Sequence, residues 1–81
     1  MSARVKLPPE LSSLLRSELD TAITEAALHR DDELIARRYI IDKWCQIDIA
    51  AELGWRRATV GAHIPDILAR IIQVSEKLKR T

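Results

Sequence analysis

The chain has 81 residues, enough for one domain with a small core and too few for a second domain. Hydrophobic residues make up 47% of it, as in ordinary globular proteins, whereas its low content of aromatic residues, proline and glycine disfavours an all-β fold with many turns. The net charge of +1 is too small to indicate by itself a polyanionic partner.

No segment of the sequence predicts export or membrane insertion. Uninterrupted apolar runs are far shorter than a transmembrane span, and residues 1–9 lack the apolar core of a signal peptide. Cys45 is the only cysteine, which excludes an internal disulfide and a cysteine-rich zinc site. We therefore expect a cytoplasmic protein in a reducing compartment.

The charges are unevenly distributed along the chain. Residues 1–42 contain six basic and eight acidic side chains, whereas residues 43–81 contain seven basic and four acidic ones. The basic excess therefore belongs to the C-terminal half, which also contains the most informative motif of the sequence.

A helix is predicted from Glu10 to about Leu28, after an N-terminal arm of residues 1–9. Pro8 and Pro9 suit the first turn of a helix, where a missing N–H has no partner to lose, and Glu10 complements the positive helix end. Two interpretations stay open: this helix covers the domain core, or it forms a dimer with a second copy. Its apolar residues recur at spacings of three and four: Leu11, Leu14, Leu15, Leu19, Ala22, Ile23 and Ala26.

A second supporting helix is predicted to run to about Ile41. Asp31 or Asp32 can cap its N-terminus, because a short acidic side chain accepts hydrogen bonds from the first free N–H groups. Arg37 and Arg38 are expected to face solvent. The two predicted helices form a supporting segment over residues 10–42.

The central motif is a predicted helix-turn-helix over residues 45–64. Two short helices that cross through a tight turn need a small residue where their backbones come closest, and Ala50 fits that place. Gly54 follows the first helix, predicted over residues 46–53, where the backbone must become left-handed. Val60 then returns the second helix to the core.

Residues around the motif have more local roles. Cys45 and Asp48 stand where a capping box would place a serine or threonine and its acidic partner, so a weakened box is predicted. Trp55 is expected to fill the space between the two helices. Trp44 is interpreted as a core residue, with stacking on a base as the alternative.

The second helix of the motif is predicted to begin near Arg57 and to run to about Lys79. At 1.5 Å per residue it would be about 34 Å long, longer than the motif needs, so residues 65–81 form an extension that requires a partner. That partner is either the first predicted helix or a second copy of the chain. Pro65 removes a hydrogen bond to the carbonyl of Gly61 and is expected to kink the helix or to start a new one.

The N-terminal end of this helix is the predicted DNA-binding site, because the second helix of such a motif enters the major groove by that end. Arg56 takes the N-cap position, where Ser, Thr, Asp or Asn would stabilise the helix by about 1 kcal/mol, and Arg57 adds a cation at the positive end of the helix dipole. Two locally unfavourable residues indicate a binding role. An arginine can grip a phosphate or donate two hydrogen bonds to guanine. The alternative is a pair of solvated surface side chains.

Three further residues complete the predicted site. Thr59 can reach a phosphate or a thymine methyl, and Gln46 can donate to a phosphate from the start of the first helix. His63, one turn further along, could contact the DNA backbone or instead be an ordinary surface or core residue. Gly61 and Ala62 offer no hydrogen-bonding group to a base edge, so specificity would rest on few contacts.

No catalytic set is predicted. His29, Cys45 and His63 are separated from one another by sixteen or more residues, and the sequence has no glycine-rich phosphate loop and no metal-ligand spacing. His29 stands beside three carboxylates, but ligands on adjacent residues rarely converge on one ion. We therefore expect neither an enzyme nor a metal or cofactor site.

Residues 39–71 resemble the fourth region of bacterial sigma factors and small sigma-like helix-turn-helix proteins of bacteria and phages. Residues 44–50 (WCQIDIA) are similar to the opening of that region. Residues 53–54 are similar to its turn, and residues 59–60 and 63–64 to its recognition helix. The resemblance implies that promoter-like DNA would be contacted by Arg56, Arg57, Thr59 and His63, with Gln46 near a phosphate.

The sequence therefore predicts an all-α bundle of four to five helices that contains a helix-turn-helix. Because the chain lacks the regions with which sigma factors melt promoters and bind the polymerase, the resemblance implies a small bacterial or phage regulator. The predicted function is a dimeric DNA-binding transcriptional regulator with double-stranded DNA as its partner. The alternative is a protein-interaction module of the same fold that docks on RNA polymerase, a sigma factor or a phage component.

Overall fold

The structure, a computed structural model, describes residues 6–79, and every regular element in that range is helical. This confirms the predicted all-α bundle. Residues 1–5 of the predicted arm and the last two residues of the predicted extension lie outside the described range. In chain order the elements are α1 (Pro9–Ser12), α2 (Arg16–Glu25), α3 (Arg30–Ala36), a π-helical turn η1 (Arg37–Ile41), α4 (Gln46–Leu53) and α5 (Arg57–Lys79).

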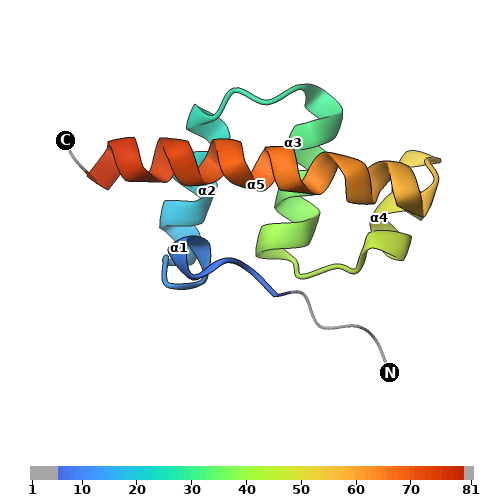
Figure 1. The fold of residues 1–81 in the computed structure, drawn as a ribbon, viewed down its shortest axis with the longest axis horizontal. Coiled ribbons are helices and arrows are strands. Elements are labelled where there is room, and N and C mark those ends of the chain that lie inside the picture. Colours follow the sequence, from blue (N-terminus) through green and yellow to red (C-terminus); the bar gives the residue numbers. More distant parts are fainter. Residues whose placement is uncertain (1–5, 80–81) are drawn as a thin grey trace.

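Helix α5 runs along the whole length of the molecule and contacts α2, α3 and α4 (Figure 1). Its bounds agree with the predicted helix. One face is buried because its apolar residues recur at helical spacing. That face shares a single core with the supporting helices, and the α5 residues buried in it are Val60, Ile64, Ile67, Ile71 and Val74.

Pro65 lies inside α5 and no new helix starts there, which corrects one of the two predicted outcomes. The residue is exposed, whereas Ile64 and Ile67 on either side are buried. The ring therefore sits on the solvent side of the helix. Packing of the opposite face against the core offsets the backbone hydrogen bond that proline cannot make.

The first predicted helix is broken into α1 and α2, and α2 ends before Leu28. Ser13 ends α1, and Leu15 adopts an extended conformation as the N-cap of α2. The Leu15 N–H donates to Glu18 Oε1 at 2.8 Å, which satisfies a donor that a continuous helix would have paired internally. The break turns Leu15 outward, so that 68% of it is exposed, although periodicity assigned it to the buried face.

The second predicted helix also differs in detail. Its N-cap is His29, which makes no side-chain capping bond, and the acidic residues instead occupy its first turn. At its other end the Asp42 N–H donates to the carbonyl of Arg37, five residues back, at 3.1 Å. This is the π-type pattern, and Lys43 closes it with a left-handed φ of 60°.

Within residues 6–79, no helix combines the length and the apolar character needed to cross a bilayer.

Candidate functional site

Helices α4 and α5 meet through a tight turn at one end of the molecule (Figure 1). The Trp55 N–H donates to the carbonyl of Ala50 at 2.9 Å, and the Gly54 N–H donates to that of Ala51 at 3.4 Å. These two bonds form a Schellman motif around Gly54, whose φ of 70° is left-handed. The predicted bounds of the first helix of the motif and the predicted role of Gly54 are both confirmed.

The N-terminal end of α5 presents two free cations. Arg56 and Arg57 are exposed, and among residues 6–79 neither guanidinium group has a hydrogen-bond or ion-pair partner. The Arg56 carbonyl accepts from the N–H groups of Thr59 and Val60 at 3.0 and 3.2 Å, which places Arg56 at the start of the helix, as predicted. The first turn contains no acidic residue. Both guanidinium groups therefore add to the positive end of the helix dipole.

Gln46 is packed between the two helices of the motif. Its side chain is half-buried and lies over Gly61 of α5, where an added Cβ would stand 3.0 Å from Gln46 Oε1. Gly61 therefore makes room for the Gln46 amide. The amide belongs to the same end of the molecule as Arg56 and Arg57.

His63 and Thr59 line a surface groove whose lining does not include Arg56 or Arg57. His63 Nδ1 lies 2.9 Å from Asp32 Oδ1 on α3, and its ring packs on Trp55 with the centroids 5.1 Å apart. His63 and Thr59 both line a surface groove of about 1360 Å³, which acidic side chains of α3 share. His63 thus connects α5 to α3. The residues of the predicted site therefore fall into two groups: Arg56, Arg57 and Gln46 at the helix-turn-helix end, and Thr59 and His63 in the groove.

Over residues 58–66, the exposed side of α5 has few groups that could bind a ligand. Ala58, Ala62 and Pro65 are exposed there, and none has a side-chain donor. Asp66, also exposed, adds a negative charge. The hydrogen-bond donors in this part of the motif are therefore the side chains of Gln46, Arg56, Arg57 and the exposed Thr59, together with His63 in the groove.

Arg38 holds α4 in place, although it was predicted to face solvent. Its guanidinium donates to both Glu52 carboxylate oxygens at 3.0 and 3.1 Å and to Asp42 at 3.0 Å. It also lies 4.6 Å from the ring centroid of Trp44. The hydrogen bonds to Glu52, and then to Asp42, raise the pKa of Arg38. Trp44 is half-buried against the core and under this arginine, as the core interpretation predicted.

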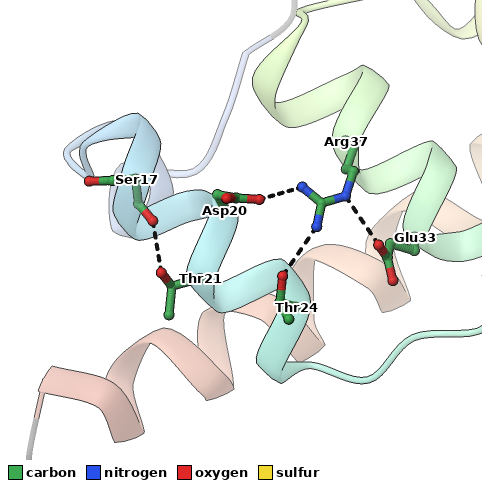
Figure 2. A network of polar contacts seen from close by, with 6 residues as sticks. All are labelled: Ser17, Asp20, Thr21, Thr24, Glu33 and Arg37. Atoms are coloured by element: carbon green, nitrogen blue, oxygen red, sulfur yellow. Dashed lines mark hydrogen bonds and ion pairs between the residues drawn. The ribbon is translucent and has the colours of Figure 1, made fainter.

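Arg37 joins the two supporting helices, again in contrast to the prediction that it faces solvent. Figure 2 shows its guanidinium between α2 and α3: it donates to Asp20, to Thr24 Oγ1 at 3.2 Å and to Glu33 at 3.1 Å. The same view shows Thr21 donating to the carbonyl of Ser17 on the other flank of α2. Only the Glu33–Arg37 spacing of four residues could have been recognised in the sequence.

Metal-ligating groups do not gather in the described part of the chain. No group of three His, Cys, Asp or Glu side chains there could hold an ion. Cys45 is a free thiol whose Sγ donates to Asp48 Oδ2 at 3.2 Å. The thiol makes no capping bond to the backbone of α4, so the predicted weakened capping box is wrong.

No family model, curated protein sequence or solved structure matched the chain. The resemblance to the fourth region of sigma factors therefore stays a prediction.

Proposed function

We propose that the chain is a DNA-binding protein that regulates transcription, and that α4 and α5 form the helix-turn-helix that contacts the major groove. The observation that carries this proposal is the contrast among the arginines. The side chains of Arg37, Arg38 and Arg70 are bound to protein groups, whereas those of Arg16, Arg30, Arg56 and Arg57 are exposed and without a partner among residues 6–79. Of these four, Arg56 and Arg57 are adjacent to each other. They stand at the end of the helix that enters DNA in this motif.

In this proposal, the side chains at the helix-turn-helix end contact different parts of the DNA. Arg57 and Arg56 would reach a phosphate or the O6 and N7 acceptors of guanine, because a guanidinium offers paired donors. Gln46, at the start of α4, would donate to a phosphate on the near side of the groove. Thr59 and His63 contribute less in this proposal, because they line the acidic groove and His63 is bound to Asp32.

Fluorescence anisotropy tests the proposal directly. A labelled random pool and promoter-like duplexes are titrated with protein at two salt concentrations. We expect binding that weakens steeply as salt rises, because neutralised phosphates release counterions, and enrichment of one sequence from the pool.

Two variants locate the interface. Arg56→Ala and Arg57→Ala should each weaken binding by about tenfold, a typical cost of losing one charged contact. Arg16→Ala is the matched control, because Arg16 is also exposed and without a partner among residues 6–79 but lies on α2. If all three variants bind DNA with the same affinity, α5 is not the helix that contacts the DNA.

A second candidate function is docking on another protein. The apolar surface of Ala58, Ala62 and Pro65 favours it, and so does Ile47 on α4, which is 61% exposed. A regulator of this class would bind RNA polymerase, a sigma factor or a phage protein through the same helices. Absence of DNA binding even at low salt, with capture of purified polymerase by the wild type but not by Ile47→Asp, would favour this function.

A further inference from the structure

Next to Arg57, the exposed side of α5 is almost entirely apolar. Ala58, Ala62 and Pro65 are exposed, and their spacings of four and three residues place them on one side of the helix. We call these three residues the apolar face. Val60 and Ile64, which are buried, lie on the other side of the helix. The apolar face is therefore turned away from the core, toward any ligand that approaches the helix from solvent.

The surfaces on both flanks of the apolar face limit how DNA can approach it. On one flank, the Gln46 side chain lies over Gly61, so α4 occupies this flank. On the other flank, Thr59 and His63 line the groove that also contains acidic side chains of α3. Carboxylates repel phosphate groups, so DNA is disfavoured on the groove side. DNA bound at the helix-turn-helix end of α5 would therefore have its base edges opposite the apolar face.

The chemistry of the apolar face restricts which base edges it can recognise. Alanine and proline side chains have no hydrogen-bonding group, so they cannot pair with the donors and acceptors of the bases. The C5-methyl group of thymine is the apolar group that base edges present in the major groove. Alanine side chains are also short, so the helix can come close to the floor of the groove without a clash.

We infer that Ala58 and Ala62 contact thymine methyl groups, so that the DNA bound by this motif carries T·A pairs beneath the first two turns of α5. This inference rests on the proposed function and adds what the site reads. The two alanines are about 6 Å apart along the helix, which is the length of about two base-pair steps. Arg56 and Arg57 would bind phosphates or a guanine beside these pairs.

Replacement of thymine by uracil tests the inference with the wild-type protein. Uracil lacks only the C5-methyl group and keeps the hydrogen-bonding groups of thymine. In the duplex selected from the random pool, thymines are replaced one at a time, and affinity is measured by fluorescence anisotropy. We expect a loss of about fourfold for each contacted methyl group, the equivalent of one buried CH₂ group. The slope of log affinity against log salt should not change, because no phosphate contact is lost.

Glycine variants connect the lost methyl groups to the protein. Ala58→Gly and Ala62→Gly each remove the side-chain methyl, so each variant should be less sensitive than the wild type to uracil at one thymine. Ala69→Gly is the matched control, because Ala69 is exposed on the same helix about two turns beyond Ala62 and the change has the same cost in helix propensity. Each comparison is between two duplexes with one variant, so a difference in folding stability cancels.

The outcomes separate the inference from the proposed function. If the wild type binds the thymine and uracil duplexes equally, the protein binds DNA without reading thymine methyl groups, and the inference is wrong. If uracil weakens binding equally in the wild type and in all three variants, the methyl groups act through the shape of the DNA, and the inference is again wrong. If the wild type binds no duplex even at low salt, the proposed function fails and the inference fails with it.

Discussion

Single residues that look alike in the sequence have different roles in the structure. Arg37 and Arg38 bind partners on other elements, whereas Arg56 and Arg57 bind none among residues 6–79. The sequence could not separate these pairs, because Asp20 is seventeen positions from Arg37. Such a pairing depends on how helices pack and leaves no local spacing signal.

Arg37 should matter for stability because it bridges α2 and α3. We expect Arg37→Met to lower the free energy of unfolding by about 1–2 kcal/mol, since the contacts are charge-assisted but a third of the side chain is exposed and screened. Urea denaturation measures the loss. Arg16→Met, at an exposed position without a partner among residues 6–79, should change stability by less than about 0.5 kcal/mol.

The effect of Arg37 should not depend on pH near neutrality. The hydrogen bond to Asp20 is the largest cause that raises its pKa, and Glu33 adds to it. A raised pKa contributes stability that is complete below the unfolded-state value and is lost only as pH rises through the folded-state value. The difference between wild type and Arg37→Met should therefore be equal at about pH 7 and about pH 9. A difference that shrinks at the higher pH would contradict this assignment.

His63 should be energetically coupled to Asp32. In a double-mutant cycle with alanine at both positions, we expect a coupling of about 0.5–1.5 kcal/mol in the free energy of unfolding. Trp55 packs on His63 and provides a fluorescence signal for the measurement. The same cycle with Asp31, an exposed neighbour, should be additive. If the changes in the free energy of unfolding are additive in both cycles, the contact between His63 and Asp32 does not stabilise the fold.

At the scale of elements, the sequence predicted α4 and α5 well and the N-terminal helices less well. Gly54 and the run of apolar positions define the ends of α4 and the buried face of α5, and these signals are local. The break before α2 was missed because Leu14 and Leu15 continue the helical periodicity of their neighbours. The π-type turn of η1 was missed because its sequence, RRYII, has no composition that distinguishes it from an α-helix.

The contact between α4 and α5 can be tested at Gly61. Alanine usually stabilises a helix interior by about 1 kcal/mol relative to glycine, but its Cβ would stand 3.0 Å from Gln46 Oε1. We therefore expect Gly61→Ala to stabilise the protein by about 1 kcal/mol in a Gln46→Ala background and by less in the wild type. Thermal denaturation of the four proteins provides the comparison. If Gly61→Ala stabilises the wild type and the Gln46→Ala variant equally, Gln46 does not lie over Gly61.

At the scale of the whole molecule, the net charge of +1 does not indicate that two adjacent arginines without side-chain partners, Arg56 and Arg57, lie together at one helix end. Arg56 and Arg57 lie at an exposed helix end, as expected from the sequence, and their contact with DNA stays a prediction. The acidic groove beside Thr59 could not be predicted. That groove arises from α3 packing near α5, and its residues are far apart in the chain. Salt dependence measures how many cations act together at the interface.

If Arg56 and Arg57 each neutralise one phosphate, Arg56→Ala and Arg57→Ala should each reduce the slope of log affinity against log salt by about one. Arg16→Ala should leave the slope unchanged. A slope that stays constant in all three variants would mean that the arginines do not contact phosphate. Weaker binding at a constant slope would identify a neutral contact instead.

Helix α5 also determines when the chain can fold. It is the last described element to be synthesised, and it contributes buried residues to the core along its whole length. Synthesis proceeds from the N-terminus, so the earlier helices emerge without the surface that covers them. Short isolated helices are marginal in water. These residues should therefore acquire their native structure in one cooperative step once α5 has been synthesised, and a chain truncated before Arg57 should be unfolded.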